Sequence, residues 1–175
     1  RGALDVGCNF FAGYPITPAS GILTHMLREL PKAGGTGVHG EDEISSIGHR
    51  IGASTAGATA FNASSVPGLS LYSENIVLAI MMEVPMIITI SQRLGPSTGA
   101  ATAAAQGDIQ FMRWCNSGGY PVIVLSPTNI PESYHLTKRA FKLAKRFRNP
   151  VFIATDKETV MTTESVAVSE MTETP

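Results

Sequence analysis

The chain has 175 residues, with 14 acidic and 13 basic side chains and a formal net charge of −1. This length is enough for one domain with a buried core, and the balanced charge argues against a protein that binds nucleic acid through a basic surface. Charged residues are only 15% of the chain, against roughly 25% in an average soluble domain. We therefore expect another polypeptide to cover part of the surface.

Neither a membrane helix nor a metal or disulfide framework is predicted. The longest apolar stretch, residues 76–90, is interrupted by Glu83 and Pro85 and is shorter than the ~20 residues that span a bilayer. Cys8 and Cys115 lie far apart, without the spacing of a zinc site, which favours a protein of the reducing cytoplasm. The chain begins without Met or a secretory leader, so we expect a piece of a longer protein.

Short apolar runs alternate along the chain with longer segments of helical period. The runs are rich in Val, Ile and Phe and are bounded by Gly or Pro, as buried parallel strands are. They comprise residues 8–12, 36–39, 58–63, 86–91, 122–125 and 151–154. Such alternation predicts an α/β fold: a doubly wound, mostly parallel sheet with helices on both faces.

Four helices are expected between these strands. Pro18 suits the first turn of a helix over residues 19–30, and the isoleucines of residues 43–55 form one apolar stripe. Residues 69–82 are apolar nearly all round, which predicts a buried helix, and a fourth helix covers residues 131–146. The domain is expected to end at residue 156, with residues 157–175 forming a polar linker or tail.

Chemically useful side chains follow four of the predicted strands. Ligands of an open parallel sheet bind beyond the carboxyl ends of its strands. The segments found there are residues 13–18, 40–43, 64–68 and 92–99. Together they offer the hydroxyl of Thr17, the carboxylate of Glu43, a turn of small residues and the guanidinium of Arg93. Their convergence predicts a binding site at this edge of the sheet.

Each of these features alone has a simpler explanation. Acids at a helix start usually cap it and complement its dipole. Arg93 could form a surface ion pair, and the prolines around Thr17 could simply stiffen the turn from strand to helix. The Gly35-Thr-Gly-Val-His-Gly40 segment matches a dinucleotide-binding pattern, but it precedes a strand instead of joining strand to helix. We therefore do not predict a nucleotide site there.

Four motifs, taken together and in order, resemble a known family. They are Gly13-Tyr-Pro-Ile-Thr-Pro18, Glu41-Asp-Glu-Ile44, Gly52-Ala-Ser-Thr-Ala-Gly-Ala58 and Gln92-Arg-Leu-Gly-Pro-Ser-Thr-Gly99. This series resembles the thiamine-pyrimidine-binding domain in the alpha subunit of 2-oxoacid:ferredoxin oxidoreductases, in the 2-oxoglutarate and pyruvate branches. The resemblance covers residues 1–156, which are therefore expected to form one thiamine-pyrimidine-binding α/β domain.

The resemblance implies a role for each site residue. Glu43 would be the catalytic glutamate that activates thiamine diphosphate, and Thr17 and Arg93 would bind the substrate carboxylate. The remaining cofactor contacts would come from Tyr14, Pro15, Ile16 and Ser65. A glutamate that shares a proton with the aminopyrimidine promotes loss of the C2 proton of the cofactor, and a guanidinium is a planar, permanently charged partner for a carboxylate.

By the same resemblance, the chain is part of an enzyme that decarboxylates a 2-oxoacid oxidatively, with coenzyme A as acyl acceptor and ferredoxin as electron acceptor. 2-Oxoglutarate is the favoured substrate, and pyruvate or a branched-chain 2-oxoacid is the alternative. A non-catalytic assembly subunit of the same fold remains a third possibility. Thiamine diphosphate would be shared with a beta subunit that carries Mg²⁺ and an iron-sulfur cluster, because this chain lacks a Gly-Asp-Gly…Asn segment and cluster cysteines.

Four positions depart from the family pattern. Val66 and Leu94 stand where glycines are usual, and Ala101 and Ala103 stand where a proline and a lysine are common. If the turn at residue 66 requires a positive φ, a valine there would be strained. The differences spare Glu43 but leave substrate choice and loop geometry open.

Overall fold

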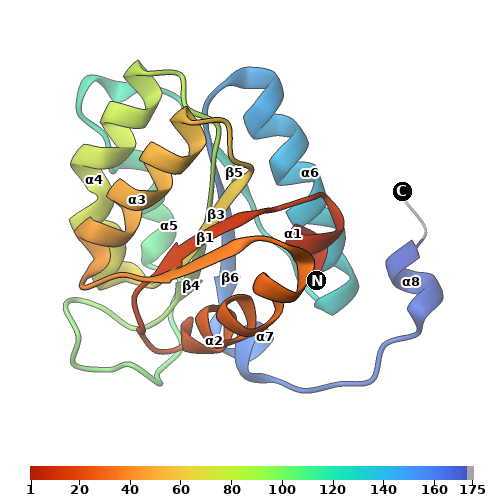
Figure 1. Cartoon of the computed structure of the whole chain (residues 1–175). Coiled ribbons are helices and arrows are strands. Elements are labelled where there is room, and N and C mark those ends of the chain that lie inside the picture. The colour runs from red at the N-terminus through yellow and green to blue at the C-terminus, as the bar shows by residue number, and fades with distance from the viewer. Residues whose placement is uncertain (173–175) are drawn as a thin grey trace.

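The computed structural model describes residues 1–172 and contains a six-stranded, entirely parallel sheet with helices on both faces (Figure 1). The sheet order is β2-β1-β3-β4-β6-β5. The strands are β1 (Phe10–Gly13), β2 (Thr36–His39), β3 (Ala60–Ser64), β4 (Met86–Gln92), β5 (Ile123–Leu125) and β6 (Pro150–Asp156). The chain leaves β1 toward one edge and β3 toward the other, so the predicted doubly wound parallel sheet is confirmed.

The helices form two layers, one on each face of the sheet (Figure 1). One layer contains α1 (Gly2–Asp5), α2 (Ser20–Glu29) and α6 (Ile130–Phe147), and the other contains α3 (Glu43–Thr55), α4 (Val66–Met81) and α5 (Asp108–Trp114). Short helical segments are η1 (Pro31–Ala33), η2 (Ser117–Gly119), α7 (Lys157–Met161) and α8 (Val168–Thr172). Of the helices in this described part, none combines the length and apolarity needed to traverse a bilayer.

The apolar runs become strands because their side chains are buried on both faces. In β4, Ile87 packs with α2 and α6, whereas Ile88 and Ile90 pack with α3 and α4. Strands buried on both sides need continuous apolar sequence instead of alternation, which is why these runs identified them. Cys8 and Cys115 are free thiols in the two different cores, where burial raises the pKa of each to about 11.

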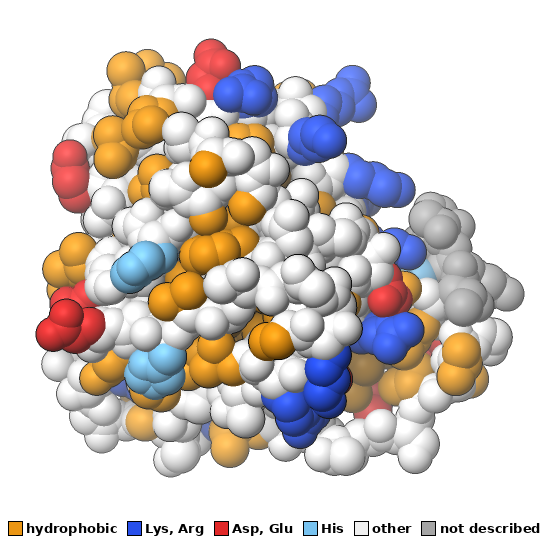
Figure 2. Space-filling view, in the orientation of Figure 1, with side chains coloured by type: hydrophobic (Ala, Val, Ile, Leu, Met, Phe, Trp, Pro, Cys, Tyr) orange, Lys and Arg blue, Asp and Glu red, His pale blue; other side chains and the backbone are white. Residues whose placement is uncertain are grey.

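The helix α4 corrects the prediction of a helix buried all round. Leu69, Tyr72 and Ile76 are fully buried, but Leu78 and Met81 on its other side are exposed. Hydrophobic side chains are visible at the surface over the C-terminal end of α4 (Figure 2). An apolar pattern does not distinguish a side chain that faces the sheet from one that faces outward, so the sequence overstated the burial.

The Val66 turn carries no strain. Val66 is the first residue of α4 and is not among the described non-glycine residues with positive φ, which are Glu83, Ser97 and Arg148.

The C-terminal stretch, expected to be a linker or tail, contains two short helices. Residues 157–172 include α7 and α8, and His135 of α6 contacts the Glu170 carbonyl at 2.6 Å. Residues 173–175 of that stretch lie outside the described residues.

Candidate functional site

The four segments singled out in the sequence meet at one edge of the sheet. They follow β1, β2, β3 and β4, which are neighbours in the order β2-β1-β3-β4. The crossovers from β1 and β3 leave in opposite directions, so the topological switch point, where doubly wound sheets bind their ligands, lies between the carboxyl ends of these two strands. The predicted convergence of these segments is therefore confirmed, whereas the roles of their side chains stay predictions.

Glu43 is the one buried acid of its segment. Asp42 caps α3, because its carboxylate accepts from the Ser45 amide at 2.6 Å, so the capping role belongs to Asp42. Glu41 and Asp42 are exposed, whereas Glu43 is only 8% exposed. Among the described residues its carboxylate forms no ion pair. A buried carboxyl without a cationic partner is costly for a folded protein and marks a candidate functional group.

A glycine in the first turn of α4 makes room for the Glu43 side chain. A Cβ atom on Gly68 would lie 2.8 Å from Glu43 Cγ and would overlap Ser64 Oγ. The helix can therefore approach both side chains only because residue 68 has none. The position of Glu43 is set by packing as well as by the helix start.

Arg93 lies inside the protein and joins two of the predicted site segments. Its residue is 3% exposed, its Nη1 donates to the Thr17 carbonyl at 2.6 Å, and its backbone amide donates to Asp108 Oδ2 at 3.2 Å. Burial raises the pKa of Asp108. The Nε of Arg93 is buried without a hydrogen-bond partner among the described residues. Buried donors are almost always paired in native proteins, so this one fits an anionic ligand.

The segment after β1 forms the side wall of this edge. Tyr14 and Ile16 are half-buried and Pro15 is exposed. The Tyr14 ring packs edge-on against His39 at the end of β2, with ring centroids 6.2 Å apart. These side chains offer an aromatic and apolar surface of the kind that walls a planar ring.

Ser65 holds the β3–α4 junction together. It occupies the N-cap position of α4, but its side chain makes no capping bond; its hydroxyl is buried and donates to the Ser91 carbonyl at 2.9 Å. In this structure the hydroxyl thus ties β3 to β4. A direct cofactor contact from Ser65 stays a prediction.

Three buried polar residues near this edge were not singled out from the sequence: Asn62 on β3, Tyr72 on α4 and Asp108 at the start of α5. Ser64, also buried, was included only as part of the turn of small residues at 64–68. The signal that could have found Asn62 is the polar–apolar alternation of Asn62-Ala63-Ser64 inside an otherwise apolar strand. Tyr72 was hidden in an apolar helix.

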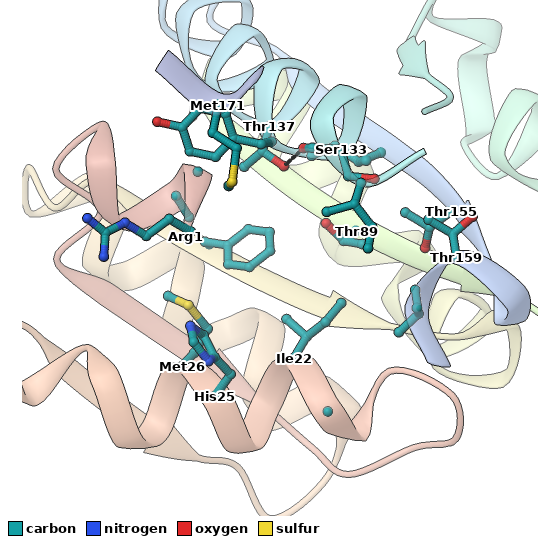
Figure 3. A pocket seen from close by; sticks show the side chains of 18 of the residues that line it. Arg1, Ile22, His25, Met26, Thr89, Ser133, Thr137, Thr155, Thr159 and Met171 are labelled. Carbon is teal, nitrogen blue, oxygen red and sulfur yellow. Dashed lines mark hydrogen bonds between the residues drawn. The ribbon is translucent and has the colours of Figure 1, made fainter. Parts of the chain in front are cut away.

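Two cavities lie away from this edge of the sheet. The one in Figure 3, about 540 Å³, lies between α2 and α6, where Ile22 and Met26 face Ser133 and Thr137. The other, about 610 Å³, lies at the opposite end of the strands, beside Lys142 and Lys145. Neither is lined by Glu43 or Arg93.

Comparison with known proteins identifies the family. The family model described as pyruvate flavodoxin/ferredoxin oxidoreductase, thiamine diphosphate-binding, matches residues 1–174. The chain belongs to this family. The match confirms the family expected from the order of the four motifs.

Individual relatives point in the same direction. The 2-oxoglutarate synthase subunit KorA of Archaeoglobus fulgidus is 48% identical over 173 residues, which cover 99% of this chain and 50% of that protein. The corresponding subunit of Methanocaldococcus jannaschii is 50% identical over 157 residues, covering 90% of this chain and 43% of that protein. The chain therefore spans about half the length of the curated relatives it matches.

The fold of this chain also matches that of a solved structure. The 2-oxoglutarate:ferredoxin oxidoreductase from Magnetococcus marinus, with 2-oxoglutarate, coenzyme A and succinyl-CoA bound, superposes with a TM-score of 0.88 at 38% identity. The superposition covers 91% of this chain and 28% of that chain. The thiamine-binding α/β fold is thus established for the described residues.

Gly68 provides a test of the packing around Glu43. We expect Gly68→Ala to lower the free energy of unfolding by about 1–3 kcal/mol, as overpacking a core does, because the new Cβ meets Ser64 and Glu43. Urea denaturation measures this. Gly52→Ala is the matched control: it lies within α3 with no atom within 4 Å of its Cβ position, and we expect it to stabilise by up to about 1 kcal/mol. Equal effects of the two substitutions would contradict the packing described.

Proposed function

We propose that this chain forms the pyrimidine side of a thiamine diphosphate site in a 2-oxoacid:ferredoxin oxidoreductase, and that the enzyme acts on 2-oxoglutarate with coenzyme A. The observation that carries the proposal is Glu43: a buried carboxyl without an ion pair among the described residues, at the switch point of a thiamine-binding fold. The names of the similar proteins support 2-oxoglutarate as the substrate and coenzyme A as the acyl acceptor.

The residues at this edge fit the aminopyrimidine half of the cofactor. The Gly68 cradle holds the Glu43 stem against α4, the ring of Tyr14 and the side chain of Ile16 offer an apolar wall, and Glu43 Oε can meet a ring nitrogen. When bound, thiamine diphosphate supplies a nucleophilic carbon and an electron sink for decarboxylation.

Glu43 holds a proton in this scheme. With thiamine diphosphate bound, its Oε atom would share that proton with a ring nitrogen of the aminopyrimidine, and the base supplied there would be the cofactor's own amino group. Burial strengthens the hydrogen bond, because the low local dielectric leaves the pair unscreened. Asp42 helps indirectly, since its cap fixes the first turn of α3, which begins at Glu43.

Arg93 and Thr17 bind and orient the 2-oxoacid. The guanidinium is anchored to the Thr17 carbonyl through Nη1, and the buried Nε is the donor that the substrate carboxylate would satisfy. An anchored guanidinium loses little freedom when it binds, so more of its interaction energy serves to hold the oxo carbon in place. The Thr17 hydroxyl adds a second donor.

The site is completed by another polypeptide in this proposal. A beta subunit carries Mg²⁺, the diphosphate site and an iron-sulfur cluster, and ferredoxin takes the electrons. The exposed apolar residues of α4 and the low charge content support a covered surface. A reducing cytoplasm is the proposed location, since Cys8 and Cys115 are both free thiols.

Substrate choice is tested in the assembled enzyme. The full-length protein is co-expressed with its beta subunit, and viologen reduction is measured with coenzyme A and each 2-oxoacid. We expect kcat/KM for 2-oxoglutarate to exceed that for pyruvate and for a branched-chain 2-oxoacid by about tenfold or more, the discrimination that one additional charged contact gives. A preference for pyruvate would overturn the substrate assignment. If the assembled, cofactor-loaded complex were inactive with every 2-oxoacid, the result would instead favour a role of this chain as a non-catalytic assembly subunit.

A further inference from the structure

A group of buried polar side chains lies behind Glu43, on the inner side of the sheet edge. It consists of Asn62 and Ser64 on β3 and Tyr72 on α4, all fully or almost fully buried. Asn62 and Ser64 alternate with Phe61 and Ala63, which pack in the core under α2 and α6. The two polar side chains consequently face α3 and α4, the helices that carry Glu43 and Tyr72.

These side chains lack ordinary hydrogen-bond partners. The Ser64 hydroxyl, the Tyr72 hydroxyl and both amide atoms of Asn62 are buried without a bond of good geometry to any described residue. More than about 90% of buried polar groups in native proteins are paired. Since an unpaired buried polar group is costly, a cluster of them beside a candidate catalytic residue requires a functional explanation.

The cluster connects Tyr72 to Glu43 through Ser64. Tyr72 lies one helical turn after Gly68 on α4, so it shares the face of the helix that meets Ser64 and Glu43. Its hydroxyl is near enough to these side chains that Ser64 and Asn62 lower its pKa and the Glu43 charge raises it. Ser64 Oγ and Glu43 Cγ both lie within contact distance of the same point, the missing Cβ of Gly68. Burial raises the pKa of Tyr72, so its hydroxyl remains a proton donor at neutral pH.

We infer that Tyr72, acting through Ser64, is a positioning residue for Glu43. In the cofactor-loaded enzyme the Tyr72 hydroxyl would donate to Ser64 Oγ and the Ser64 hydroxyl to one carboxylate oxygen of Glu43, which would leave the other oxygen for the cofactor; neither bond is formed among the described residues in this structure. No proton is lost in this arrangement, because each hydroxyl keeps its own. The inference rests on the proposed function, in which Glu43 activates thiamine diphosphate.

Fully buried Arg50 anchors the far side of the same helix pair. Its Nη2 donates to the carbonyls of Ala60 and Pro85, at 2.9 and 3.3 Å. Ala60 begins β3 and Pro85 directly precedes β4, so Arg50 holds α3 against the amino-terminal ends of these strands and does not reach the edge where Glu43 lies. It therefore serves as a structural tie, and the orientation of the Glu43 carboxyl is left to Ser64 and Tyr72.

The inference is tested with Tyr72→Phe, which removes one hydroxyl and keeps the ring in the core. In the assembled holoenzyme, the readout is the rate at which the C2 proton of bound thiamine diphosphate exchanges with deuterium oxide. We expect exchange to slow by about tenfold, the effect of one lost hydrogen bond, while the dissociation constant of the cofactor and the KM for the 2-oxoacid change less than about twofold. Such a split separates orientation of Glu43 from general damage.

Tyr134→Phe is the matched control. Tyr134 is another buried tyrosine, on α6 in the opposite layer, and its hydroxyl donates to Asp5 at 2.7 Å. Its replacement also removes a tyrosine hydroxyl and its hydrogen bond, but exchange should keep the wild-type rate. Ser64→Ala repeats the test should Tyr72→Phe fail to assemble, and the double variant should exchange no more slowly than the slower single variant.

The outcomes separate this inference from the proposed function. If Glu43→Gln blocks exchange while Tyr72→Phe and Ser64→Ala both exchange like the Tyr134→Phe control, the positioning role is overturned and the proposed function stands. If Glu43→Gln itself exchanges at the wild-type rate, the proposed function fails first. Slow exchange in all three site variants, with the control unaffected, supports both.

Discussion

Replacement of Glu43 by glutamine is expected to lower the rate of ferredoxin reduction by a factor of roughly 10²–10⁴, which is the contribution of a positioned general acid–base group. Glutamine has nearly the same shape, so it fits the space beside Gly68, but it cannot share a proton with the aminopyrimidine. Binding of the partner subunit should be unaffected, because the side chain is buried at the sheet edge and forms no ion pair with the described residues.

The matched control is Glu41→Gln, which removes a carboxylate two residues earlier, just before α3. Glu41 is exposed, whereas Glu43 is buried. Viologen reduction, gel filtration and cofactor content are measured for both variants. Turnover of Glu43→Gln within about twofold of wild type would contradict the catalytic role, whatever the control does.

Replacement of Arg93 by alanine is expected to lower kcat/KM for the 2-oxoacid by about 10- to 150-fold, the effect of one lost hydrogen bond to a charged group. Most of the loss should appear as a higher KM with a smaller fall in kcat, because the guanidinium binds the carboxylate both before and during the reaction. The KM for coenzyme A should stay unchanged. Steady-state kinetics with each substrate varied in turn measures the effect.

The structure adds a second consequence for this variant. The Arg93 side chain also donates to the Thr17 carbonyl at 2.6 Å, so its loss loosens the β1–α2 corner. Arg93→Lys separates the two effects, since it keeps the charge but not the planar fork, and it should recover only part of the activity. Arg139→Ala, an exposed arginine on α6, is the control. An unchanged kcat/KM in Arg93→Ala would remove this residue from the site.

Much of the fold could be predicted because its physical causes are local. Strands buried on both faces require apolar runs, and the expected bounds of residues 36–39 and 43–55 agree with β2 and α3. The meeting of four segments at one edge followed from the rule that parallel strands end on the same side. The choice of Glu43 came from the resemblance to the family, and the structure adds that it is the buried acid of its segment.

The remaining features depend on contacts that no local pattern reports. The bond from the Arg93 amide to Asp108 spans a long loop, and α5, which begins at Asp108, lies in a part of the chain without a marked apolar period. Tyr72 is part of an apolar helix, so its proximity to Ser64 appears only once α4 is packed against the sheet. The same limit explains why α4 was expected to be buried on every side.

The central claim is that Glu43 of this chain activates thiamine diphosphate, and the rate of C2 proton exchange of the bound cofactor tests it most directly. The measurement compares wild type, Glu43→Gln and Glu41→Gln in the complex with the partner subunit, without 2-oxoacid. We predict that exchange falls by about 100-fold or more in Glu43→Gln and stays at the wild-type rate in Glu41→Gln. Equal exchange rates in wild type and Glu43→Gln, at equal cofactor occupancy, would contradict the claim.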